Sequence, residues 1–80
     1  MNVTKQEFDF MVQSLTTDLI TILTEENHLP VSKAFDILYQ SNTFAKLCDA
    51  NTGLYYQSAR YVYSYLVEER KEMIDQALAC

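Results

Sequence analysis

Apolar residues recur every three or four positions over the first third of the chain, which predicts a long amphipathic helix. We expect it over residues 4–26, because Thr4 and Glu7 have the spacing of a capping box. The apolar stripe consists of Phe8, Met11, Val12, Leu15, Leu19, Ile22 and Leu23. Phe10 and Ile20 lie off this stripe and widen it. We expect these two either to pack at the edges of the core or to contact another subunit.

Breakers and caps in the middle of the chain predict two shorter helices. The segment 27–30 ends the first helix, and Pro30 suits the first turn of a helix over 30–40. Residues 41–43 offer a fresh N-cap for a short helix over 43–49. Val31 should face inward from the first of these helices, and Cys48 from the second.

A turn at residues 49–53 leads to the last helix. Gly53 can adopt a positive φ there, and residues 54–57 are expected to be extended or irregular. Ser58 then caps a helix over 58–78. Its apolar pattern is interrupted at Glu69 and Arg70, so its last two turns should leave the core.

These elements predict an all-α fold: a compact bundle of two long and two short helices, in a single domain over residues 1–80. One Gly and one Pro among 80 residues argue against a β-sandwich or barrel, which needs frequent turn residues. With 49% hydrophobic and 21% charged residues, the composition favours a globular chain. A domain of this size often gains stability by oligomerising.

Charge narrows the range of partners. The net charge is −5, and the six Lys and Arg residues are scattered, whereas binders of nucleic acid or of anionic membranes normally show a basic face. We therefore expect neither nucleic acid nor a membrane as partner. No secretory signal and no apolar run of membrane-spanning length is visible, and the thiols are expected to be free, which favours a cytoplasmic location.

The sequence holds no constellation that would support catalysis. His28 is the one histidine, and Cys48 and Cys80 are far apart, so no zinc set and no other metal site is expected. Neither a phosphate-binding glycine loop nor a hydrolase motif is present, and the acidic pairs suit solvated helix faces. We expect no cofactor and no enzymatic activity.

Tyrosines are the one unusual feature. Five of the six fall within eleven residues: Tyr55, Tyr56, Tyr61, Tyr63 and Tyr65. Tyrosine often anchors protein interfaces, because its ring buries a large area while its hydroxyl still forms hydrogen bonds. Alternatively, the rings cover the core of a small protein with their hydroxyls in water. The candidate interface residues are Tyr55, Tyr56, Tyr61 and Tyr65, together with Phe10 and Ile20.

A set of packing and turn patterns extends over roughly residues 6–70. They include Pro-Val-Ser-Lys-Ala-Phe-Asp-Ile-Leu-Tyr-Gln-Ser over 30–41, Thr-Gly-Leu-Tyr-Tyr-Gln-Ser over 52–58, the segments 47–49 and 61–63, and Leu66 with Glu68 and Glu69. In these patterns the chain resembles a family of small uncharacterised bacterial proteins, known only as a domain of unknown function. The resemblance implies a short, helical, cytoplasmic protein. Some members are encoded beside toxin-like genes, which implies an antitoxin or partner-binding role.

These observations leave three hypotheses about the function of the protein. The favoured hypothesis is a non-enzymatic helical module that self-associates or binds a partner protein. The alternative is a DNA-binding regulator with a helix-turn-helix over residues 31–49, although its second helix would carry Lys46 as its one basic residue. A small enzyme, for example one with an activated Cys48, is the third hypothesis, but a buried Cys more often behaves as a small apolar residue.

Overall fold

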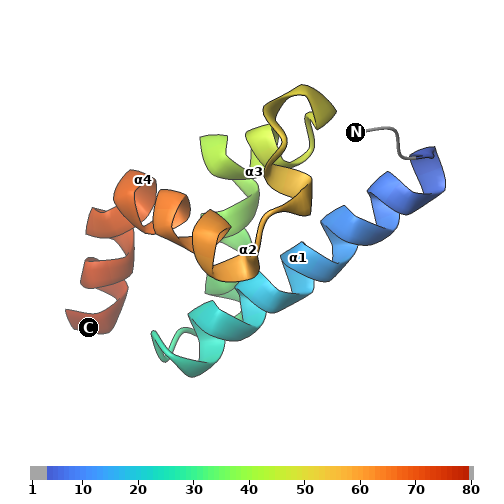
Figure 1. Cartoon of the computed structure of the whole chain (residues 1–80). Coiled ribbons are helices and arrows are strands. Elements are labelled where there is room, and N and C mark those ends of the chain that lie inside the picture. Colours follow the sequence, from blue (N-terminus) through green and yellow to red (C-terminus); the bar gives the residue numbers. More distant parts are fainter. Residues whose placement is uncertain (1–3, 80) are drawn as a thin grey trace.

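The computed structural model describes the backbone of residues 4–79 and the side chains of residues 4–71. Within this range the chain is helical and has no strand, so the predicted all-α class is confirmed. The elements, in order, are α1 (Lys5–Glu25), α2 (Val31–Tyr39), α3 (Asn42–Leu47), the 3-10 helices η1 (Ala50–Thr52) and η2 (Leu54–Tyr56), and α4 (Ala59–Ala79). In Figure 1, α1 runs diagonally across the view and the other helices lie on one side of it.

Both ends of α1 are fixed by local hydrogen bonds. The predicted capping box is confirmed: the Thr4 hydroxyl accepts from the Glu7 N–H at 3.1 Å, and the Glu7 carboxylate accepts from the Thr4 N–H at 3.0 Å. After the helix, His28 adopts a left-handed conformation with φ of 57°. The Leu29 N–H then donates to the Leu23 carbonyl at 3.3 Å, so the chain turns back toward the core.

The core lies where the apolar stripe of α1 meets α2, α3, η2 and α4. Leu19, Leu23, Ile37, Leu47 and Leu66 are fully buried in it. Partly buried residues pack around this centre: Phe8, Met11, Val12, Ile20, Phe44, Ala59, Tyr63 and Val67. The prediction that Ile20 packs at the edge of the core is therefore confirmed, whereas Phe10 is 69% exposed.

Three local predictions are wrong. Leu54–Tyr56 is not extended, because η2 winds into a 3-10 turn that buries both Leu54 and Tyr55; of the four residues predicted to be extended or irregular, only Gln57 is extended. Val31 is exposed at the first turn of α2, and Leu29, two residues earlier, fills the core instead. Cys48 is exposed because it caps the C-terminus of α3, where the chain has already turned away from the core.

The helix α4 changes direction where its apolar pattern stops. Ser58 accepts the N–H of Tyr61 at 3.2 Å, which confirms the predicted cap at its start. Eleven residues into the helix, Arg70 has non-helical backbone angles, φ −115° and ψ 21°, and the axis kinks there. Figure 1 shows the last turns of α4 turning away from the direction of its first part.

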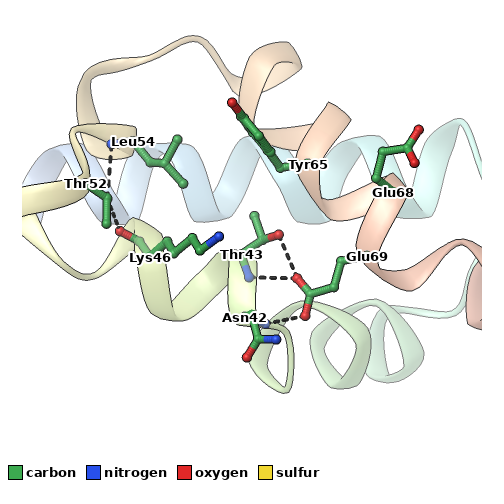
Figure 2. Close-up of a pocket in the computed structure, with 8 residues that line it drawn as sticks. All are labelled: Asn42, Thr43, Lys46, Thr52, Leu54, Tyr65, Glu68 and Glu69. Carbon is green, nitrogen blue, oxygen red and sulfur yellow. Dashed lines mark hydrogen bonds between the residues drawn. The ribbon is translucent and has the colours of Figure 1, made fainter.

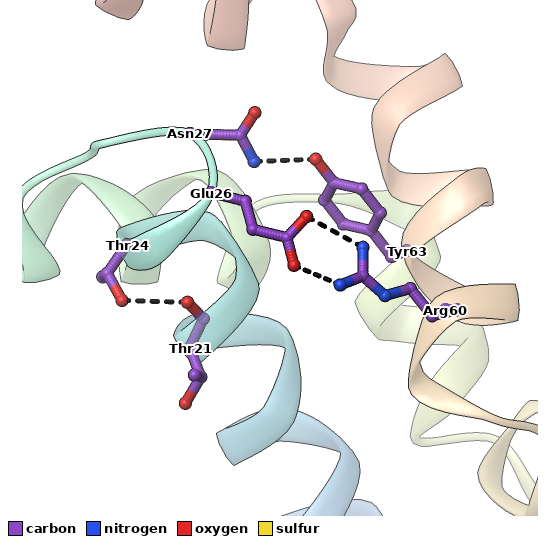
Figure 3. Close-up of polar contacts among 6 residues, drawn as sticks. All are labelled: Thr21, Thr24, Glu26, Asn27, Arg60 and Tyr63. Carbon is purple, nitrogen blue, oxygen red and sulfur yellow. Dashed lines mark hydrogen bonds and ion pairs between the residues drawn. The ribbon is translucent and has the colours of Figure 1, made fainter.

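Polar contacts tie the C-terminal end of α1 to the start of α4 (Figure 3). The guanidinium of Arg60 pairs with both carboxylate oxygens of Glu26, one of them at 2.9 Å. Beside this pair, the Asn27 amide donates to the Tyr63 hydroxyl at 2.7 Å. The hydrogen bond from Arg60 lowers the pKa of the Glu26 carboxyl. Tyr63 is therefore occupied by a contact within the domain and lies partly buried.

Candidate functional site

The candidate tyrosines separate into a buried group and an exposed group. Tyr55 is 4% exposed, and its ring meets Phe8 edge-on at a centroid distance of 4.9 Å. It is part of the domain's own core, so it offers no surface to a partner. Tyr56, Tyr61 and Tyr65 are each about half exposed: 48%, 45% and 47%.

Tyr61 and Tyr65 form an ordered pair on one face of α4, which we call the tyrosine pair. They are four residues apart, so their side chains lie on the same side of the helix. Their rings meet edge-on with centroids 5.2 Å apart, and their hydroxyl oxygens are 3.0 Å apart and share a hydrogen bond. That hydrogen bond raises the pKa of Tyr61. Each ring therefore restricts the rotamer of the other.

A hollow of about 490 Å³ opens beside Tyr65, between α3 and α4 (Figure 2). We call it the α3–α4 hollow; its walls are Asn42, Thr43, Lys46, Thr52, Leu54, Tyr65, Glu68 and Glu69. Most of these side chains are polar or charged, and they come from both sides of the gap. The Glu68 carboxylate has no hydrogen bond to another described residue and is exposed. In Figure 2 this carboxylate is directed away from Thr43, Lys46 and Glu69.

Glu69 has a structural role in this hollow. Its Oε1 accepts from the Thr43 N–H at 2.8 Å and from the Thr43 hydroxyl at 2.7 Å, and its Oε2 accepts from the Asn42 N–H. Partial burial works to raise the pKa of Glu69, but the hydrogen bonds from Asn42 and Thr43 outweigh it and lower the pKa. The carboxylate is thus held ionised with its oxygens occupied, which does not suit a general acid.

A second hollow, which we call the α1–α2 groove, has an apolar character. Its walls are Val12, Gln13, Thr16, Thr17, Ile20, Thr21, Phe35, Tyr39 and Phe44, and its volume is about 480 Å³. Three rings form a continuous row: Tyr39 is 5.2 Å from Phe35 and 4.8 Å from Phe44, between centroids. No wall residue carries a charge at neutral pH.

Two of the three threonines in this groove, Thr16 and Thr21, use their hydroxyl protons in hydrogen bonds within α1. Thr16 donates its hydroxyl to the Val12 carbonyl at 2.8 Å, and Thr21 donates to the Thr17 carbonyl at 2.9 Å. Because these hydroxyl protons are used within α1, Thr16 and Thr21 offer no free donor at the groove wall, whereas the side chains of Gln13, Thr17 and Tyr39 have no hydrogen bond to another described residue. The α1–α2 groove could not be predicted from the sequence. The spacing of Phe35 and Tyr39 was its one visible signal, because residues four apart share a helix face.

The described residues hold no group of three or more His, Cys, Asp and Glu side chains close enough to bind a metal. Cys48 is unpaired, and partial burial of its sulfur raises the pKa of its thiol. A raised pKa leaves less of the reactive thiolate at neutral pH, which does not suit a nucleophile. Cys80 lies outside the described residues. Across the described part of the chain, no helix combines the length and the apolar character needed to span a membrane.

Comparison with family models, with curated proteins and with solved structures gives no match to this chain. The resemblance noted from the sequence therefore stays a prediction.

Proposed function

We propose that this protein is a non-enzymatic protein-interaction module that binds a partner protein through the tyrosine pair. The observation that carries the proposal is the geometry of Tyr61 and Tyr65: two half-exposed rings fixed against each other on one helix face. Large aromatic side chains that are already ordered contribute area to an interface at little cost in conformational entropy. Their hydroxyls can also exchange their mutual hydrogen bond for bonds to a partner.

The partner is proposed to be a protein with a basic surface. Tyr65 and Glu68 both belong to the wall of the α3–α4 hollow, and the Glu68 carboxylate has no hydrogen bond to the other residues drawn in Figure 2. The whole chain carries a net charge of −5. Complementary charge speeds the encounter of two proteins and selects between partners. An antitoxin-like role, in which this chain covers the basic surface of a toxin, fits this chemistry. The proposal includes a cytoplasmic location, where a free thiol such as Cys48 stays reduced.

Affinity capture of the tagged protein from its native cell extract tests the proposal. The bait should retain a second protein in stoichiometric amount, and Tyr61→Ala with Tyr65→Ala should release it. Tyr56→Ala is the matched control, because it removes an equally exposed tyrosine away from the pair. Circular dichroism should show unchanged helicity in all variants. If the retained protein stays bound to the doubly substituted bait, the tyrosine pair is not the interface.

The helix-turn-helix alternative has less support. Its second helix would be α3, which has six residues and one basic side chain, Lys46. In that motif the N-terminal residues of the recognition helix approach the bases, and here the carboxylate of Glu69 occupies that end of α3. A negative charge at this place would repel the DNA backbone. A mobility shift of any DNA fragment at low salt would revive the alternative.

A further inference from the structure

Tyr65 and Glu68 are presented together on the exposed surface of α4. They are three residues apart, so their side chains leave neighbouring turns on the same face of the helix, with Cβ atoms about 5–6 Å apart. Figure 2 shows that both side chains are directed away from α3. Tyr65 is 47% exposed, and Glu68 is exposed as well. A partner that contacts the tyrosine pair therefore meets an aromatic ring and a carboxylate one turn apart.

The charge of Glu68 is not neutralised within the described part of the chain. Lys46 is the basic residue on the wall of the α3–α4 hollow, but the Glu68 carboxylate is directed away from it. Lys71 follows Glu68 by three positions, a spacing that allows an ion pair in a regular helix. Here Arg70 lies between them with non-helical backbone angles, and Glu68 forms no ion pair with a described residue. Glu69, by contrast, uses both carboxylate oxygens at the start of α3.

An aromatic ring and an unpaired carboxylate at this separation match the side chain of arginine. Its planar guanidinium stacks on the face of an aromatic ring, and its N–H groups can donate two parallel hydrogen bonds to a carboxylate. The ammonium group of lysine is a compact and strongly hydrated charge without a planar face for stacking. A site of this kind therefore favours arginine over lysine.

We propose that Tyr65 and Glu68 form a subsite for an arginine side chain of the partner protein. The guanidinium stacks on the exposed ring of Tyr65 and donates hydrogen bonds to the Glu68 carboxylate. The contact of Tyr65 with Tyr61 restricts the ring on which the guanidinium stacks. The inference rests on the proposed function, because the arginine belongs to the partner that binds the tyrosine pair. It adds the kind of side chain that this surface selects.

The test is titration of the isotopically labelled full chain with an acetylated hexa-arginine peptide at low salt, followed by nuclear magnetic resonance. An acetylated hexa-lysine peptide is the matched probe, because it carries the same charge without guanidinium groups. The signals of Tyr65 and Glu68 should shift when the arginine peptide is added. The affinity for the lysine peptide should be about two- to fivefold lower, the range expected for one exposed contact between a cation and an aromatic ring.

Three variants assign the contacts. Glu68→Gln should weaken binding of the arginine peptide about two- to fivefold, as expected for an exposed ion pair. Tyr65→Leu should remove the preference for arginine over lysine, because leucine offers no ring for stacking. Glu25→Gln is the matched control: it removes the same charge at an exposed residue at the end of α1, and it should weaken binding less than Glu68→Gln does. Circular dichroism should show unchanged helicity, since all three residues are exposed.

Equal affinity for the two peptides overturns the arginine subsite, and so do equal losses of affinity in Glu68→Gln and Glu25→Gln. Neither result bears on the proposed function, which affinity capture tests separately. A captured partner that is released by Tyr61→Ala with Tyr65→Ala, but is retained unchanged by the Glu68→Gln bait, keeps the tyrosine pair as the interface and excludes the subsite. A partner that stays bound to the bait without both tyrosines overturns the proposed function and the subsite with it.

Discussion

Glu69 on α4 caps the N-terminus of α3, because its carboxylate accepts both the backbone N–H and the hydroxyl proton of Thr43. The two residues are 26 positions apart in sequence. The first N–H groups of a helix lack intrahelical partners, and a carboxylate also interacts favourably with the helix dipole. Ser41 supplies the local N-cap by accepting from the Phe44 N–H at 3.0 Å. The start of α3 is therefore stabilised both by its own sequence and by another helix.

Replacement of Glu69 by Gln should destabilise the protein by about 0.5–1 kcal/mol, within the usual range for a helix cap and reduced by the exposure of this side chain. For a domain of 60–100 residues this corresponds to a fall of about 2–8 °C in Tm. Thermal denaturation followed by circular dichroism measures the change. Glu68→Gln is the control, because Glu68 is the neighbouring carboxylate and is exposed in the same hollow. Equal losses for the two variants would contradict the capping role.

The same contact predicts how stability depends on pH. Hydrogen bonds lower the pKa of Glu69 in the folded protein, so the folded state binds this proton more weakly than the unfolded state does. The contribution is therefore fully present above the unfolded pKa of about 4.3, and it is lost as pH falls through the lower, folded pKa. Urea denaturation between pH 7 and pH 3 should show a loss of stability at acidic pH that is smaller in Glu69→Gln than in the wild type. Because Glu7 and Glu26 also have lowered pKa values, the comparison with the variant isolates Glu69.

Gly53→Ala should destabilise the protein by about 1–2 kcal/mol. Gly53 has a φ of 75°, and an added Cβ would lie 2.8 Å from the hydroxyl oxygen of Tyr56. The substitution thus adds backbone strain and a steric clash. Urea denaturation of Gly53→Ala, Tyr56→Ala and the double variant separates the two effects. In the Tyr56→Ala background the cost of Gly53→Ala should shrink but not vanish, because the strained φ remains. A cost independent of Tyr56 would show that its exposed ring moves aside freely.

Tyr55 and Tyr56 should respond very differently to truncation although they are adjacent. Tyr55→Ala should cost about 3–5 kcal/mol, because it removes a buried ring that contacts Phe8. Tyr56→Ala should change stability by less than about 1 kcal/mol, since its side chain is half exposed. Chemical denaturation measures both. Tyr55→Phe should cost little, because the hydroxyl of Tyr55 has no hydrogen bond to another described residue. A large loss in Tyr55→Phe would indicate a polar contact of this hydroxyl.

The positions of the candidate interface tyrosines could be predicted from the sequence only in part. The spacing of Tyr61 and Tyr65 placed them on one helix face, since residues four apart in a helix are neighbours. The sequence could not separate Tyr55 from Tyr56, because they follow a turn and belong to no long periodic pattern. The 3-10 helix η2 determines which of the two tyrosines is buried: it directs the ring of Tyr55 into the core and the ring of Tyr56 outward. The α1–α2 groove could not be predicted from the sequence either, because its row of aromatic rings includes residues on both sides of the break between α2 and α3.

The sequence by itself determined the helical class, the cap at Thr4, the turns at residues 27–30 and at Gly53, and the cap at Ser58. Each of these depends on a few neighbouring residues, so local propensity and hydrogen bonding suffice to specify it. Only the tertiary structure decided which aromatic rings are buried, how Glu69 caps α3 and where the two hollows open. These features join residues that are distant in sequence. Their positions depend on how the helices pack against one another, and local sequence patterns do not specify that packing.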